Sequence, residues 1–243
     1  MSNKKLIDKK TGFDVNEDFY RFEQRYDVFC RSDWDPEVKS KKASEFFAGY
    51  HMPNARGRKA DGFGRKDYAL RNAAWHVSNV IRDLRRETDD RKEGFLDTFT
   101  AHEDGWPEPY PFESADAASQ NLKRAADVIG AGLMGVCEYD DRWVYSARYS
   151  EKTQQSKPID IPDDLPRVIV IGEPMDFGLT ATVPSALSGS ATGMGYTHDT
   201  FVLLTLAQYI RNLGYRAVAS MNDSALAIPL AVQAGLGEVG RNS

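Results

Sequence analysis

Apolar residues recur at helical spacing in the first half of the chain. Within residues 67–100, the segment DYALRNAAWHVSNVIRDLRRET places apolar and charged side chains on opposite sides, with a period of about 3.6 residues. The apolar stripe consists of Leu70, Ala73, Ala74, Val77, Val80, Ile81 and Leu84. The pattern predicts an amphipathic helix that packs this stripe into a core and exposes Arg82, Arg85 and Arg86.

From residue 114 onward, the pattern alternates between helical and strand-like segments. Ser114 is an N-cap candidate, and Gly130 and Gly132 are stop signals, so residues 114–130 predict a helix. The run LMGVCEYD predicts a strand. The β-branched run RVIVIG, at 167–172, predicts a strand that is buried on both faces.

The last part of the chain continues this alternation. After a loop rich in glycine and serine, HDTFVLLTLAQYIRNLGY predicts a helix that Thr197 or Asp199 caps and Gly214 ends. RAVAS, at 216–220, predicts another strand, and SALAIPLAVQAG predicts a further helix. This order favours an α/β (α+β) fold, with a β-α-β arrangement beside a pocket built from loops.

A proline-rich stretch divides the chain. GWPEPYPFES breaks regular structure and predicts a boundary between an N-terminal region at 1–113 and an α/β domain at 114–243. The N-terminal region carries an aromatic arm, RFEQRYDVFCRSDWDP, in which Phe22, Tyr26 and Phe29 share a helical face. These rings either pack into a core or line a ligand site.

The composition, with 41% hydrophobic and 28% charged residues, is that of a soluble globular protein. A net charge of −5 argues against nucleic-acid binding driven by bulk electrostatics. No apolar run reaches the ~20 residues of a membrane span, and the charged start MSNKKLIDKK lacks a secretory signal. We therefore expect a cytoplasmic protein. Cys30 and Cys137 lie far apart and the four histidines are scattered, which predicts buried free thiols and no metal site.

The segment AGLGEVGRNS contains a literal G-x-G-x-x-G at Gly235, Gly237 and Gly240. A dinucleotide fingerprint needs these glycines directly after a strand and at the start of a helix. Here they follow an apolar helical pattern, so the context argues against NAD or FAD. Two interpretations remain open: a helix C-cap followed by a turn, or a loop whose backbone lies against a planar cofactor.

Four segments together resemble the cobalamin-binding part of the reductive dehalogenases: GAGLMGVCEYDDRWVYS, VIVIGEPMDF, GYTHDTFVLLTLAQYIRNLGYRA and MNDSALAIPLAVQAGLGEVGRNS. The resemblance is strongest over 121–243, and the N-terminal aromatic segment also resembles these enzymes. It implies a nitroreductase-like corrinoid-binding domain, incomplete in this chain, in an enzyme that removes halide from an organohalide. It also implies base-off cobalamin and two [4Fe–4S] clusters, whose cysteine runs we expect downstream of Ser243.

The resemblance assigns roles to individual residues. Tyr196 matches the proton-donor tyrosine of the family, and Asn222 matches a position that orients this tyrosine or the halide. We expect the substrate pocket to include Thr192, Phe29 and Trp34. The expected corrinoid contacts are Ser224, Ala234, Gly235, Leu236, Gly237, Glu238, Gly240 and Arg241.

Ordinary structural roles exist for the same residues. Tyr196 could pack its ring at a helix entry, Asn222 could cap the following helix, and Arg241 could be a surface arginine. His198 is given no metal role, because the family resemblance implies a corrinoid without a histidine ligand.

Two other functions stay open at this point. An epoxyqueuosine-reductase-like corrinoid enzyme acting on tRNA would share the A-G-L-G element, although the aromatic segment fits it poorly. A non-catalytic corrinoid-binding module is the third alternative. For the dehalogenase, the expected partners are a small organohalide and an electron donor, either a ferredoxin, a flavodoxin or a fused reductase. A homodimer is one possible assembly.

Overall fold

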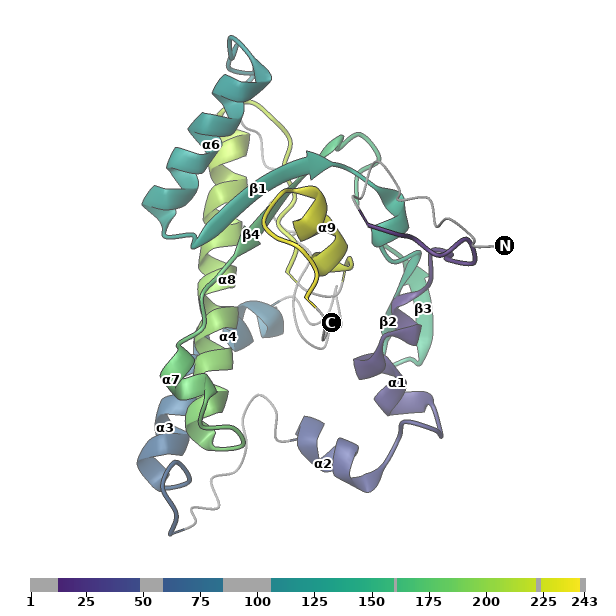
Figure 1. The fold of residues 1–243 in the computed structure, drawn as a ribbon, viewed down its shortest axis with the longest axis vertical. Helices are drawn as coiled ribbons and strands as arrows, with labels where there is room; N and C mark the ends of the chain where they lie inside the picture. The colour runs from purple at the N-terminus through teal and green to yellow at the C-terminus, as the bar shows by residue number, and fades with distance from the viewer. Residues whose placement is uncertain (1–12, 49–58, 85–105, 160, 222–223, 241–243) are drawn as a thin grey trace, which may run out of the picture.

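In the residues that the structure describes, the protein is a mixed structure of helices and two small sheets, and the mixture of helices and strands is as the pattern predicts (Figure 1). The computed structural model describes residues 13–48, 59–84, 106–159, 161–221 and 224–240. In chain order the helices and strands are α1 (Val28–Trp34), α2 (Lys41–Ala48), α3 (Arg65–Ala74), α4 (His76–Leu84), α6 (Ala115–Ile129), β1 (Leu133–Glu138), β2 (Ala147–Ser150), β3 (Gln155–Pro158), β4 (Arg167–Gly172), α7 (Phe177–Thr180), α8 (Ala186–Asn212) and α9 (Ala227–Gln233). The nitroreductase-like character of the fold stays a prediction.

Helix α8 forms one side of the molecule, and α3, α4, α6 and α7 pack against it (Figure 1). It has 27 residues and is therefore about 40 Å long. The Ser185 side chain caps it by accepting a hydrogen bond from the Ser188 N–H. The predicted caps Thr197 and Asp199 are wrong, because both residues lie well inside the helix.

Glycine content explains why the first turns of α8 read as a loop in the sequence. Glycine disfavours an isolated helix, but it also lets another helix approach closely. A Cβ at Gly193 would lie 2.6 Å from Cδ1 of Trp75, and one at Gly189 would collide with the Arg71 side chain. Gly189 and Gly193 are therefore the contact surface of α8 for the end of α3 and for Trp75.

Residues 65–84 form two helices, α3 and α4, which meet at Trp75. The single helix predicted here is wrong, and the part predicted beyond Leu84 lies outside the described residues. The inward face matches the predicted stripe only in part, since Ala74 is buried and Ile81 packs against a core cluster. Trp75, Ser78 and Asn79 are buried, whereas four stripe residues are largely exposed: Leu70, Val77, Val80 and Leu84.

Strands β1 and β4 pair antiparallel, with Val136 opposite Ile169. The predicted β-α-β arrangement is wrong for this sheet, and residues 216–220 form no strand but connect α8 to α9. Strand β4 is partly exposed along most of its length, not buried on both faces. Gly135 of β1 lets α9 pack on the sheet, because a Cβ there would lie 2.9 Å from the Ala234 Cβ.

The N-terminal aromatic arm packs against the segment around β2. Tyr145 and Tyr149 donate hydroxyl hydrogen bonds to Asp27 and Asp33. Arg21 donates to the backbone carbonyls of Val144 and Tyr145. These contacts join residues on both sides of the predicted 113/114 division, which itself stays a prediction.

Two further expectations concern cysteines and membrane spans. Cys30 and Cys137 are buried and not joined in a disulfide, as predicted, and Cys137 packs with Trp143 and Leu230 in a small apolar cluster. In the part of the chain that the structure describes, no helix has the length and apolar character needed to cross a membrane.

Candidate functional site

Tyr196 lies in the middle of α8, where its ring packs on Trp75. The ring centroids are 4.9 Å apart and the planes are tilted by 30°. Trp75 is fully buried, and its indole Nε1 donates a hydrogen bond to the Gly189 carbonyl at 3.1 Å. The Thr197 hydroxyl donates to the Ala74 carbonyl at 2.7 Å and fixes α8 against α3. The ring of the candidate proton donor thus packs on a buried indole that is itself held by a hydrogen bond.

Thr192 precedes Tyr196 by four residues, and the helix places both on one face. Its hydroxyl donates to the Ser188 carbonyl at 3.3 Å. Because residues 186–197 are helical, the predicted proximity of these two side chains follows from the structure. Whether they line a substrate pocket stays a prediction.

Sequence reasoning missed Trp75 as part of this site. It stood in the middle of the apolar segment, but helical periodicity assigned the inward face to its neighbours. The useful signal was the pair Gly189 and Gly193, since small residues one turn apart mark a place where a large ring can enter.

A second group of side chains, also missed, lies beside the same helix. Glu173 follows β4, and its Oε2 lies 2.9 Å from Nδ1 of His198. Asp199, the next residue on α8, is mostly buried. Burial, reinforced by the Glu173 carboxylate, raises the pKa of Asp199 to about 6, and His198 opposes this shift. No sequence spacing connects Glu173 to residues 198 and 199, because the contact is made between a strand end and a helix.

The glycine segment begins as the C-cap of α9. Gly235 has φ of +73°, its N–H donates to the Val232 carbonyl, and the Leu236 N–H donates to the Ala231 carbonyl at 2.9 Å. This pair of hydrogen bonds is the Schellman pattern of a helix end. The geometry therefore excludes the dinucleotide interpretation, which needs a helix start at this place.

Beyond the cap, the segment has an open backbone surface. A Cβ placed at Gly235, Gly237 or Gly240 would meet no atom within 4 Å among the described residues. Glu238 is exposed, and Leu236 is half-buried. These features fit a loop that a large planar ligand can approach, so the residues present are compatible with a corrinoid.

Ser224 lies shortly before α9, and Ala234 is its C-cap. Ser224 is buried, and its carbonyl accepts a hydrogen bond from the Tyr145 N–H at 3.0 Å. The Ala234 N–H donates to the Leu230 carbonyl. Asn222 and Arg241 lie outside the described residues, so their predicted roles stay predictions.

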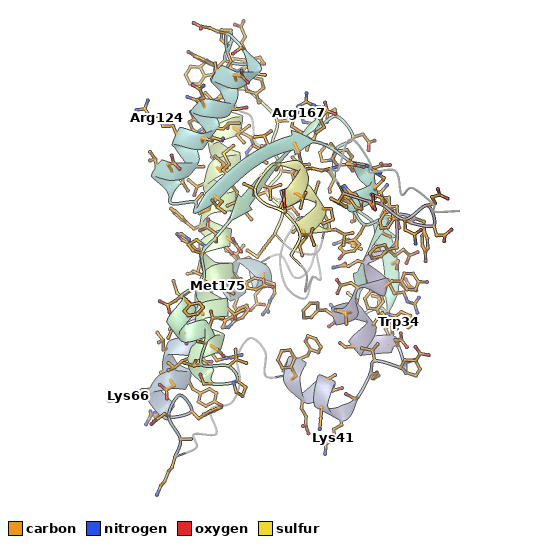
Figure 2. All side chains as sticks on the ribbon, viewed as in Figure 1. Trp34, Lys41, Lys66, Arg124, Arg167 and Met175 are labelled. Carbon is orange, nitrogen blue, oxygen red and sulfur yellow. The ribbon has the colours of Figure 1, made fainter. Side chains whose placement is uncertain are left out.

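The structure does not bring Phe29 and Trp34 to Tyr196. Both belong to α1, which lies across the molecule from α8 (Figure 1). Figure 2 shows Trp34 on the side opposite Met175, a neighbour of Gly195 in α8. The Trp34 Nε1 donates to the Arg25 carbonyl, and the Arg25 guanidinium lies 4.3 Å from the Trp34 ring centroid. Phe29 packs edge-on against Phe47 at 5.9 Å.

Comparison with known proteins finds several relatives that share one enzyme name. No family model matches the chain. A tetrachloroethene reductive dehalogenase of Desulfitobacterium hafniense is 34% identical over 170 residues, which is 55% of this chain and 30% of that protein. The enzyme of the same name from Dehalobacter restrictus is 32% identical over 167 residues, again 55% and 30%. That of Sulfurospirillum multivorans is 30% identical over 145 residues, 49% of this chain and 29% of that protein.

The chain is therefore related to the reductive dehalogenases, and the resemblance predicted from its motifs is confirmed. Its matched part spans about 30% of the length of these curated relatives.

Proposed function

We propose that this chain is part of a reductive dehalogenase, an oxidoreductase that replaces halogen by hydrogen on an organohalide. The observation that carries the proposal is the position of Tyr196, whose ring lies on the buried Trp75 in a chain related to such enzymes. The organohalide is a small molecule in this proposal, and electrons come from a separate or fused donor.

Tyr196 would supply the proton for the carbon that loses halogen. A phenol keeps its proton at neutral pH and can transfer it to a developing carbanion, and such acid catalysis contributes about 10²–10⁴-fold to a rate. The Trp75 ring fixes one face of the Tyr196 ring and excludes water from it. Thr192, one turn away, would contact the substrate from the same helix face.

A corrinoid, when bound, supplies the low-potential metal centre that reduces a carbon–halogen bond. The residues that would hold it are Ser224 and the segment 234–241. Iron–sulfur clusters do not fit this chain. Each needs four cysteine ligands, whereas the chain has two cysteines, both of them buried. The proposal assigns electron delivery to groups outside these 243 residues.

The test is reconstitution of the full chain with hydroxocobalamin, followed by assay of halide release under a chemical reductant. Bound corrinoid is measured by its visible absorption after gel filtration. Haloalkene and haloaromatic substrates are then compared. Absence of corrinoid uptake would overturn the cofactor proposal, and uptake without halide release would favour the non-catalytic module.

Tyr196→Phe tests the proton donor, with Tyr209→Phe as the matched control on the same helix. The Tyr209 hydroxyl donates to Asn121 at 2.6 Å, far along α8 from the Trp75 contact. We expect Tyr196→Phe to bind corrinoid normally and to lose about 100-fold in halide release. Equal activity of both variants would remove Tyr196 from the mechanism.

A further inference from the structure

Glu173 and His198 form a bonded pair that reaches from the interior of the protein to solvent, and both act electrostatically on Asp199, the next residue of α8. The Glu173 side chain is 4% exposed, whereas the His198 side chain, bonded to it at 2.9 Å, is 45% exposed. The second Glu173 oxygen, Oε1, is buried and has no hydrogen-bond partner among the described residues. A buried carboxylate oxygen without a partner is costly, so this arrangement is poorly explained by stability alone.

Asp199 links this pair to the candidate site. It follows Tyr196 by three residues and Thr192 by seven, and positions i, i+4 and i+7 fall on one face of a helix. The two charged groups that act on its carboxyl are Glu173, from the end of β4, and His198, from α8 itself. Two carboxyl groups held close together favour retention of a proton by one of them.

We propose that Asp199 returns a proton to Tyr196 after each turnover, and that Glu173 and His198 connect Asp199 to solvent. This inference rests on the proposed function of Tyr196. The phenolate left after proton donation takes the proton of the Asp199 carboxyl, so one O–H bond forms and one breaks. The Asp199 carboxylate is then reprotonated from solvent through the His198 and Glu173 pair. No electron is transferred in either step.

The protonation of Asp199 supports this assignment. Burial and the Glu173 charge raise its pKa to about 6, so a useful fraction of Asp199 still carries a proton near neutral pH. An exposed aspartate would be almost fully ionised there. Glu173 is thus a positioning residue that acts by its charge on Asp199.

The test compares first and later turnovers of the reconstituted full chain. In Asp199→Asn, Tyr196 begins protonated, so we expect the first halide to be released at the wild-type rate. Later turnovers should slow by about 100-fold. Asp127→Asn, which changes an exposed carboxyl on α6, serves as the matched control and should alter neither phase. A purely structural role of Asp199 would affect both phases equally.

An infrared titration gives a second readout that needs no cofactor and no activity. The protonated carboxyl band of isotope-labelled aspartate is followed against pH, and the Asp199 component is identified by its loss in Asp199→Asn. Glu173→Gln should move its midpoint to lower pH, because a neighbouring negative charge is removed. A midpoint at the ordinary aspartate value, unchanged by Glu173→Gln, would overturn the proposed effect of Glu173 on Asp199.

The two proposals fail in different ways. A wild-type chain that takes up corrinoid but releases no halide overturns the proposed function. A wild-type chain that releases halide, with Asp199→Asn equal to it in all turnovers, overturns only the role of Asp199.

Discussion

The contact between Gly193 and Trp75 gives a sharp test of how the candidate site is built. A Cβ at Gly193 would lie 2.6, 2.8 and 2.9 Å from three atoms of the Trp75 indole. These distances are shorter than ordinary carbon contacts of about 3.5–4.0 Å. Trp75 is fully buried and its Nε1 is bonded to the Gly189 carbonyl, so the ring has little room to move.

Two opposing effects decide the result of Gly193→Ala. Alanine favours a helix over glycine by about 1 kcal/mol, whereas overpacking a filled core costs about 1–3 kcal/mol. Gly195→Ala is the matched control, because its Cβ would meet Met175 at an ordinary 3.7 Å. Both variants share the gain in helix propensity, so the difference between them isolates the steric cost at Trp75.

We expect Gly195→Ala to raise the free energy of unfolding by about 0.5–1 kcal/mol. The free energy of unfolding of Gly193→Ala should be about 1–3 kcal/mol lower than that of Gly195→Ala. Urea unfolding followed by circular dichroism measures both, and for a chain of this size the difference corresponds to about 2–12 °C in the melting temperature. Equal stability of Gly193→Ala and Gly195→Ala would show that Trp75 does not pack closely on Gly193 of α8.

Further predictions concern single residues outside that contact. The folded protein binds a proton at Asp199 more tightly than the unfolded chain does, so its free energy of unfolding should fall as pH rises from about 4 to about 6. In Asp199→Asn this decrease in the free energy of unfolding should be smaller by up to about 3 kcal/mol. If urea unfolding of Asp199→Asn had the same pH dependence as that of the wild-type chain, the raised pKa would be contradicted. Ser114→Ala should cost about 1 kcal/mol in the same assay, because the Ser114 side chain accepts from the Ala117 N–H. Gly235→Ala should destabilise by about 1 kcal/mol since φ is +73°, whereas Gly237→Ala should be nearly neutral; equal effects would argue against the helix cap.

Interactions confined to a few neighbouring residues could be predicted from the sequence. Ser114 caps α6, Gly130 ends it with φ of +105°, and Gly214 follows the end of α8 with φ of +80°. The helix before Gly235 was also predicted, and this helix was the reason for rejecting a dinucleotide site. Capping depends on one side chain and the next few backbone groups, so the local sequence is sufficient.

Tertiary contacts decided the rest. The first turns of α8 are rich in glycine and would be weak in isolation, but Arg71 and Trp75 of the neighbouring helix need that space. For the same reason Trp75 faces inward, while Leu70 and Leu84 of the predicted stripe face outward.

The candidate site shows the same division between local and distant causes. The spacing of Thr192 and Tyr196 determines that they share a face once the segment is helical. Glu173 bonds to His198 only because β4 ends beside α8, although the two residues are 25 positions apart in the sequence. The proton affinity of Asp199 depends on its burial, and burial depends on what packs around the residue. A single sequence does not specify that packing.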